Sequence, residues 1–309
     1  MDDLDVRILR AMGVRPYGRT ARGADALSSA RLAEQVGVTD DTVRARVARM
    51  ESAGLIAGYR LAPNLHQMGL TGTGYYFDPV DGEPAKLARA IVDAGIPGIM
   101  EVHAFLGRGL CVELAYATDK DRLSTLDAIG RVVGSAPPVT FHAWTYPEVE
   151  RTLSALDWRI VEAMRGNARR PLPEVADEIS ISAKTVKRRF ERMAEEGSVL
   201  CVPLVDLSKA QGVLLIELLV HLTPGAPEAV LSEVVADLAG HVFHVGRPAE
   251  ASMGNADIIL AASSPAEVEK LRERVASRPG VSRADAMLVT ALEDHAAWLD
   301  ARLQALARP

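Results

Sequence analysis

Residues 179–197 read ISISAKTVKRRFERMAEEG, a short polar turn followed by a helix pattern that a glycine closes. Ser182 stands at the position expected of a helix N-cap, where a hydroxyl accepts an unpaired first-turn amide. Val186, Phe190 and Met193 recur at positions i, i+4 and i+7, which predicts one buried stripe. The stretch therefore predicts a helix that is buried on one side and polar on the other.

The polar side of this helix is strongly basic. Between residues 182 and 192, five positive side chains stand against one negative side chain. Such a face is typical of a helix that enters the major groove of DNA, although a single basic face is more often simply solvated. The residues that we expect to contact DNA here are Ser182, Lys184, Thr185, Lys187, Arg188 and Arg192.

The same pattern occurs 143 residues earlier in the chain, which favours a functional role over a solvated face. Residues 36–54, VGVTDDTVRARVARMESAG, align with residues 179–197. Upstream, residues 4–8 (LDVRI) align with residues 156–160 (LDWRI) at a shift of 152, so the first copy has nine additional residues between its first two helices. An internal repeat of this length indicates a duplicated module.

The first copy is less basic than the second. Asp40 and Asp41 fall in the first turn of its third helix, where they suit the helix dipole but would face a phosphate. Its nine-residue insertion lies within residues 13–26 and carries Arg15, Arg19 and Arg22. We interpret it as a disordered surface loop, with contact to neighbouring phosphates or a minor groove as the alternative. The residues of the first copy that we expect to contact DNA are Thr39, Thr42, Arg44, Arg46 and Arg49.

The composition agrees with this division of charge. The 309 residues carry a net charge of −6. Residues 1–60 hold ten basic and eight acidic side chains and residues 151–200 hold the same numbers, so the remainder carries −10. Positive potential is thus concentrated on two small segments.

Membrane, metal and cofactor roles are not expected. No segment resembles a signal peptide, and the apolar run at residues 213–222 contains Glu217 and His221 and is too short to span a bilayer. Cys111 and Cys201 fit no disulfide or metal spacing. We expect a soluble cytoplasmic protein without a resident metal or cofactor.

The order of short helix, Ser-capped helix, turn and Thr-capped basic helix resembles the winged-helix headpiece of the Lrp/AsnC transcription regulators. In that family the third helix ends in Gly-Leu-Ile or similar, as in residues 54–59 (GLIAGY), and a linking strand follows. The resemblance covers nearly the whole chain twice. Family members normally have one headpiece and one effector domain and act as dimers or higher assemblies, whereas both copies are fused here. The resemblance implies double-stranded DNA as the partner.

The predicted fold class is α+β, with a winged helix-turn-helix domain and a ferredoxin-like βαββαβ domain duplicated in tandem. The predicted domains are helix-turn-helix domains at residues 1–60 and 151–203 and effector domains at residues 61–150 and 204–309. The first effector segment predicts strands at residues 71–77, 99–105, 110–116 and 139–145 and helices at 83–94 and 120–133. The second predicts strands at 213–222, 242–246, 257–262 and 284–290, helices at 227–239 and 265–277, and a closing helix at 291–306.

The strand at residues 214–222 predicts how the two copies associate. One of its faces is uniformly aliphatic and suits the covering helices, while the opposite face alternates Leu215, Glu217, Leu219 and His221. A half-apolar face of this kind is a hazard in water. We therefore expect an intrachain pseudo-dimer in which one sheet faces the other, with further homo-oligomers left open.

The resemblance also implies a small-molecule effector, such as an amino acid. Family effector domains bind such ligands near a loop between the second and third strands, where Gly is followed shortly by Asp. The second copy matches this pattern with Gly254, Asn255 and Asp257, whereas the first has Gly107 and Arg108 without an acid. A tight turn in which Asp257 is hydrogen-bonded locally stays an alternative.

The favoured function is a sequence-specific DNA-binding transcription regulator, not an enzyme, whose unequal headpieces bind an asymmetric operator. His241 and His244 lack a metal-ligand pattern, and His103 and His142 are interpreted as core or surface histidines. The alternative is a tetrapyrrole (siroheme-type) decarboxylase, because a related family combines the same headpiece and sheet without binding DNA. A metabolite-binding adaptor is a third hypothesis.

Overall fold

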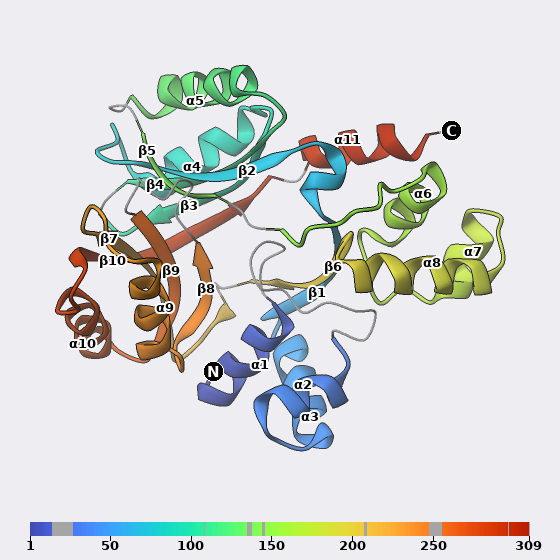
Figure 1. Ribbon diagram of the computed structural model, residues 1–309, viewed down its shortest axis with the longest axis horizontal. Coiled ribbons are helices and arrows are strands. Elements are labelled where there is room, and N and C mark those ends of the chain that lie inside the picture. The colour runs from blue at the N-terminus through green and yellow to red at the C-terminus, as the bar shows by residue number, and fades with distance from the viewer. Residues whose placement is uncertain are drawn as a thin grey trace. The chain divides into compact units, whose positions relative to one another are not determined.

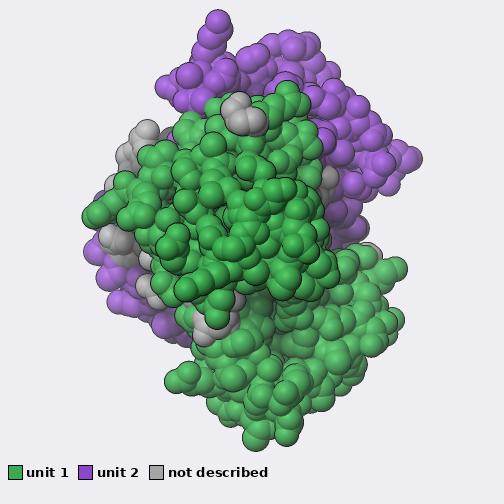
Figure 2. Space-filling model, turned by 90° about the vertical axis from the view of Figure 1, so that its right-hand side faces the viewer, with its two compact units in different colours: residues 1–69, 146–211, 300–309 green, residues 70–145, 212–299 purple. Residues whose placement is uncertain are grey.

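The computed structural model describes residues 1–13, 27–107, 109–134, 138–143, 146–206, 209–246, 255–295 and 297–308. The chain divides into two compact units, coloured separately in Figure 2. Unit 1 contains residues 1–69, 146–211 and 300–309, and unit 2 contains residues 70–145 and 212–299. The compact units thus group headpiece with headpiece and effector segment with effector segment, and the division into four sequential domains stays a prediction. Among the described helices, none combines the length and apolarity that a membrane span requires.

Among its described residues, unit 1 contains two headpieces of three helices each, and a strand follows each headpiece. The basic insertion of the first headpiece falls in residues 14–26, outside the described residues. The first headpiece is built from α1 (Asp3–Met12), α2 (Ser29–Val36) and α3 (Asp40–Ser52), followed by β1 (Ile56–Pro63). The second is built from α6 (Ala155–Met164), α7 (Leu172–Glu178) and α8 (Ala183–Glu196), followed by β6 (Val199–Val205). The short helix η1 (Leu65–Met68) follows β1, and α11 (Ala297–Ala307) ends the chain.

The third helix of each headpiece starts at the predicted residue. The Thr39 hydroxyl accepts the amide of Thr42 at 3.3 Å, and the Ser182 hydroxyl accepts the amide of Thr185 at 3.2 Å. Each hydroxyl satisfies a first-turn donor that the helix itself leaves unpaired. Gly197 ends α8 with φ 79°, in the left-handed region that favours glycine.

Strands β1 and β6 pair with each other, antiparallel, and join the two headpieces (Figure 1). The Arg169 guanidinium of the second headpiece stacks 3.6 Å from the Tyr59 ring centroid on β1. The Tyr59 hydroxyl donates to Glu51, and burial together with this hydrogen bond raises the pKa of Tyr59. Arg169 also ion-pairs with Glu51 at 3.2 Å. These contacts connect the second headpiece to β1, the strand that follows the first headpiece.

In the described part of unit 2, eight strands form one antiparallel sheet in the order β5-β2-β4-β3-β10-β7-β9-β8. The first half holds β2 (Thr71–Phe77), β3 (Ile99–Phe105), β4 (Leu110–Tyr116) and β5 (Val139–Ala143), with α4 (Pro84–Asp93) and α5 (Asp119–Val133). The second half holds β7 (Leu214–Leu222), β8 (Val242–Gly246), β9 (Asn255–Ala262) and β10 (Val281–Asp294), with α9 (Glu228–Asp237) and α10 (Pro265–Ala276). Each half follows the predicted βαββαβ order.

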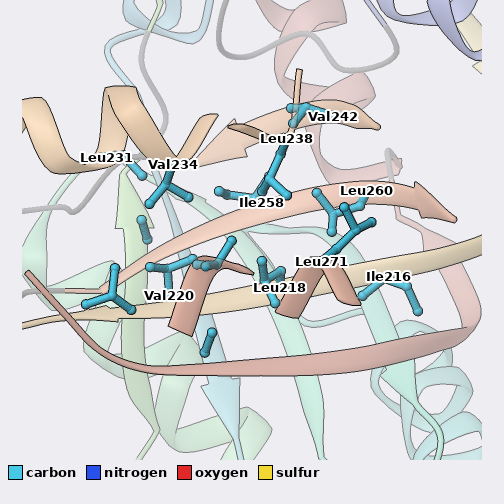
Figure 3. Close-up of a cluster of buried hydrophobic side chains, with 14 of the residues drawn as sticks. Ile216, Leu218, Val220, Leu231, Val234, Leu238, Val242, Ile258, Leu260 and Leu271 are labelled. Carbon is cyan, nitrogen blue, oxygen red and sulfur yellow. The ribbon is translucent and has the colours of Figure 1, made fainter. Parts of the chain in front are cut away.

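The aliphatic face of β7 packs under its helices as the alternation predicts. Leu218 and Val220 are fully buried, and they cluster with Val234 of α9, Leu271 of α10 and Ile258 of β9 (Figure 3). The equivalent core of the first half lies between its strands and helices α4 and α5. Each half therefore has a core of its own. Within each core, burial of one aliphatic side chain stabilises the fold by roughly 1.5–3 kcal/mol.

The predicted start of the closing helix is wrong. Residues 291–294 continue β10, and α11 begins at Ala297. The added residues pair with the edge strand of the first half, Leu292 opposite His103 and Asp294 opposite Glu101. An edge strand offers a row of unpaired backbone groups, and satisfying them outweighs the local helix propensity of this segment.

The two halves meet along an edge as well as across a face. The β3–β10 pairing makes one continuous sheet, and β5 at one end of this sheet lies beside β9 and β8 at the other. The face opposite the helices holds a shared buried cluster: Tyr76, Phe105 and Cys111 from the first half, Leu219 and Met287 from the second. The half-apolar face of β7 is therefore covered within the chain.

A glycine substitution tests this packing. A Cβ on Gly109, before β4, would lie 1.7 Å from the Phe77 carbonyl oxygen. We expect Gly109→Ala to lower the free energy of unfolding by about 3 kcal/mol, because backbone must move to relieve the overlap. Gly130 on α5 has open space, so Gly130→Ala should leave the free energy unchanged or raise it by up to about 1 kcal/mol. Urea unfolding followed by circular dichroism checks both, and equal midpoints for the two variants would contradict the packing described.

Candidate nucleic-acid interface

Three cations on the outer side of α8 are free of strong intramolecular partners. Lys184, Lys187 and Arg188 are exposed, Lys187 to 65% of its side chain. Lys187 lies 3.8 Å from Glu191, a surface pair of small energetic value. Within the described ranges, Lys184 and Arg188 make no ion pair. These three side chains extend from the helix that the sequence identifies as the recognition helix.

Arg192, also expected to contact DNA, instead binds an aspartate within the headpiece. Arg189 Nη1 and Arg192 Nη2 each donate to Asp157 Oδ1 of α6 at 2.9 Å. The Asp157 side chain is only 3% exposed, so the two guanidiniums compensate a buried charge. The five cations counted on this stretch thus divide into two that hold α8 on α6 and three that face outward.

The electrostatics of Asp157 reflect this arrangement. Burial alone would raise the pKa of its carboxyl group. Hydrogen bonds from Ser154 and Arg189 and the charge of Arg192 outweigh burial and hold the pKa below its ordinary value. The carboxylate is therefore charged throughout the neutral range, and its contribution to stability is lost only in acid.

The first headpiece repeats the device at equivalent positions. Asp5 of α1 is buried, and Arg49 and Arg46 of α3 lie 2.6 Å and 3.2 Å from its carboxylate. Arg46 also bonds to Asp2, whose pKa is lowered first by that hydrogen bond. Asp5 aligns with Asp157, and Arg46 and Arg49 align with the two arginines of α8. We name each set, one aspartate with two arginines, the aspartate clamp.

The outward-facing positions of the two headpieces are not equivalent in charge. Arg44, which aligns with Lys187, is bound by Asp40 at 2.7 Å and by Asp41 at 2.8 Å. Asp41 itself aligns with Lys184, and Ala45 aligns with Arg188. The first headpiece therefore places an acid, a neutralised arginine and a methyl group where the second places three cations.

The capping hydroxyls flank both faces. Thr39 Oγ1 lies 2.8 Å from Thr42 Oγ1, and Ser182 Oγ lies 2.8 Å from Thr185 Oγ1. Thr39 and Ser182 are exposed, while Thr42 and Thr185 are half-buried. These hydroxyls thus lie at the N-termini of α3 and α8, and the N-terminal residues of a recognition helix are those that contact base edges in the major groove.

The predicted effector loop is only partly described. Gly254 and Arg108 lie outside the described residues. Gly107 has φ 64°, as a turn glycine requires. Asn255 begins β9, and Asp257 lies within that strand opposite Leu219 with 1% of its surface exposed. The carboxylate thus belongs to the interior of the sheet rather than to a surface loop, and ligand binding by these residues stays a prediction.

Two groups of residues escaped the sequence prediction. The clamp aspartates were visible only as members of the matching LDVRI and LDWRI segments, which show a repeat but not a role. His103, interpreted as a core or surface histidine, lies in a buried cluster with Glu217 and Cys111 in unit 2. Only the tertiary arrangement brings these three together.

Comparisons with known proteins agree with the headpiece geometry. Residues 153–194 match the model of the AsnC-type helix-turn-helix domain, and residues 23–57 match that of a winged helix-turn-helix DNA-binding domain. An uncharacterized HTH-type transcriptional regulator of Pyrococcus abyssi is 28% identical over 135 residues, 43% of this chain and 80% of the relative. Another, of Pyrococcus horikoshii, is 29% identical over 106 residues, 34% of this chain and 67% of the relative.

A solved structure resembles the whole chain. The crystal structure of the siroheme decarboxylase NirDL aligns over 99% of this chain and 98% of its own, with a TM-score of 0.58 and 14% sequence identity. At that identity the likeness shows a shared fold. Both the helix-turn-helix headpieces and the mixed α/β architecture therefore have precedents among known proteins.

The aspartate clamp generates a stability prediction. We expect Asp157→Asn to lower the free energy of unfolding at pH 7 by roughly 1.5–3 kcal/mol, the contribution of a hydrogen bond to a charged group. Because the folded pKa of Asp157 is depressed, wild type should lose this contribution in acid, as pH falls below the ordinary carboxyl pKa and through the lower folded pKa. The variant lacks the titrating group, so the stability difference should shrink in acid. Urea unfolding at pH 7 and pH 3 measures it, and a difference that persists unchanged at pH 3 would refute the clamp.

Proposed function

Because this chain belongs to the Lrp/AsnC family of helix-turn-helix regulators, we propose that it binds a specific double-stranded DNA operator, mainly through its second headpiece. The observation that carries this proposal is the set of three exposed cations on α8, Lys184, Lys187 and Arg188. They lie on a helix whose opposite stripe is buried and whose orientation is fixed by the aspartate clamp. A rigid cationic helix of this kind suits the major groove.

The roles of individual side chains follow from their chemistry. Lysine and arginine bind phosphate oxygens, and both also bind the O6 and N7 acceptors of guanine. Thr185, one turn into the helix and beside the cap, suits a base or phosphate contact. Arg192, Arg46 and Arg49 support DNA binding indirectly, because they hold each third helix on its headpiece core.

The unequal charges of the headpieces support an asymmetric operator. Asp41 would repel a phosphate at the position where Lys184 would attract one. Thr39, Thr42 and Arg44 remain the candidate contacts of the first headpiece, and they supply a smaller share of the affinity. We therefore expect a DNA footprint that protects the two half-sites of the operator to different extents.

A single chain would supply the two headpieces and two effector domains that two subunits normally supply in the family. The antiparallel pairing of β1 with β6 and the continuous sheet of unit 2 support an intrachain pseudo-dimer. Further association between chains stays a hypothesis. The effector proposal, an amino acid or related small molecule near Asp257, rests on the family resemblance, and footprinting with and without candidate amino acids tests it.

A siroheme-type decarboxylase is the weaker alternative, and we propose a non-enzymatic regulator instead. The NirDL likeness concerns the fold, and large side chains, Tyr76, Phe105 and Met287 among them, fill the face between the two half-sheets. An iron tetrapyrrole that bound this protein with a Soret shift, in the absence of measurable DNA binding, would favour the alternative.

Alanine substitutions at equivalent positions test the DNA interface. We expect Lys187→Ala to cost about 1–3 kcal/mol of binding free energy if the side chain contacts a base, or to lower the slope of log K against log salt by about 1 if it contacts a phosphate. Arg44→Ala is the matched control. Its guanidinium is already neutralised by Asp40 and Asp41, so its effect should be smaller.

The measurement uses an operator selected from random double-stranded DNA by the full-length protein, with affinity determined over a range of salt concentrations. Circular dichroism confirms that each variant is folded. Equal losses at Arg44 and Lys187 would contradict the assignment of affinity to the second headpiece, and no loss at either would contradict the recognition-helix proposal.

The converse change should strengthen the first headpiece. Asp41→Lys combined with Ala45→Arg gives α3 the cations of α8, removes one carboxylate that binds Arg44 and leaves the aspartate clamp intact. We expect tighter binding to nonspecific duplex DNA and a salt slope steeper by about 2. Fluorescence anisotropy at several salt concentrations measures both quantities. An unchanged slope would show that this helix does not face DNA.

A further inference from the structure

Three metal-ligating side chains converge in the interior of unit 2. His103 lies on β3, Cys111 on β4 and Glu217 on β7, and all three are buried. One ligand atom from each, a nitrogen, a sulfur and an oxygen, lies within 4.8 Å of the other two. The first two residues come from the first half of the sheet and the third from the second half.

The hydrogen bonding within this cluster leaves one buried carboxylate oxygen unsatisfied. Nδ1 of His103 lies 2.9 Å from Oε2 of Glu217. The other carboxylate oxygen of Glu217 is buried and has no hydrogen-bond partner among the described residues. A buried carboxylate oxygen without a partner is costly, and a bound cation is one of the arrangements that satisfy it.

The surroundings supply the groups that such a site needs. Glu101 Oε2 lies 3.4 Å from Nε2 of His103, and its side chain is 21% exposed. A carboxylate that accepts the second ring N–H of a ligating histidine fixes the ring and increases its basicity. On the other side, the buried Glu113 carboxylate lies 3.9 Å from the Cys111 sulfur, two positions further along β4.

We propose that His103, Cys111 and Glu217 bind a divalent transition-metal ion of the zinc type, with Glu113 as the candidate fourth ligand. Thiolate, imidazole and carboxylate are the ligands that zinc takes in tetrahedral sites, whereas Mg²⁺ and Ca²⁺ take oxygen alone. Tetrahedral Zn²⁺ separates its ligand atoms by roughly 3.3–3.8 Å, so small side-chain movements suffice. On binding, the Cys111 thiol releases its proton to solvent.

The site would join the two halves of the sheet through side chains, in addition to the β3–β10 hydrogen bonds. Because the ligands come from three strands of both halves, the ion would stabilise this arrangement over any in which the halves separate. This proposal concerns unit 2 and does not depend on whether the headpieces bind DNA.

Cobalt substitution in the full-length protein tests the site. The protein is treated with chelator, dialysed with a non-thiol reductant and titrated with Co²⁺. We expect saturation at about one equivalent, with a thiolate-to-cobalt charge-transfer band and the visible absorption of tetrahedral Co²⁺, both abolished by added Zn²⁺. The absence of a thiolate band in the wild-type protein overturns the proposal.

The second cysteine provides a matched control. Cys201 is also buried, but it lies on β6 of unit 1 and outside the cluster. Cys201→Ser should retain the band, and Cys111→Ser should lose it. Loss of the band in Cys201→Ser alone would place the metal elsewhere and overturn the proposal.

Isosteric carboxylate variants guard against effects of misfolding. Glu217→Gln and Glu101→Gln preserve shape, and circular dichroism and thermal melting verify their fold. We expect Zn²⁺ affinity to fall at least roughly 10-fold in each, with the larger loss in Glu217→Gln, which removes a ligand. Added Zn²⁺ should raise the melting temperature of wild type more than that of either variant. Affinities equal to that of wild type in both variants would show that the ion binds outside this cluster.

Discussion

The edge-to-edge pairing of β3 with β10 is the constraint on which unit 2 depends. It converts two βαββαβ segments into one eight-stranded sheet, and it extends β10 through residues that would otherwise favour a helix. Because β5 also lies beside β9 and β8, the face that the helices leave uncovered is enclosed within the chain. Leu219, Met287, Phe105 and Tyr76 share one buried cluster as a result.

The headpieces depend on a different interaction, which occurs twice. Each places a buried aspartate on its first helix and two arginines on its third, so that a charge-assisted contact fixes the third helix on the core. Three arginines that the sequence predicts to contact DNA, Arg46, Arg49 and Arg192, are used in this way together with Arg189. The functional difference between the headpieces therefore lies in a few outward positions, where Lys184 replaces Asp41 and Arg188 replaces Ala45.

Regular alternation and capping made much of the fold predictable. The Ser182 and Thr39 caps and the aliphatic alternation of β7 are local patterns, and the helices and strands they predict lie where expected. The predictions failed where distant segments interact. The helix expected from residue 291 is strand until Asp294, because only the folded chain brings it to the edge of β3. The cationic count on α8 was correct, but its division between clamp and outer face required the position of Asp157.

The sequence by itself determined that the chain has two headpieces of one kind and two α/β segments of another, because repeats, caps and periodicities are local properties. It also determined that the second headpiece is the more basic. The tertiary structure decided which arginines remain available to a ligand, and it placed Glu217 beside His103 and Cys111. Residues 103 and 217 are separated by more than a hundred positions, and no spacing rule links them. Their proximity is a consequence of how two halves of one sheet enclose a common face.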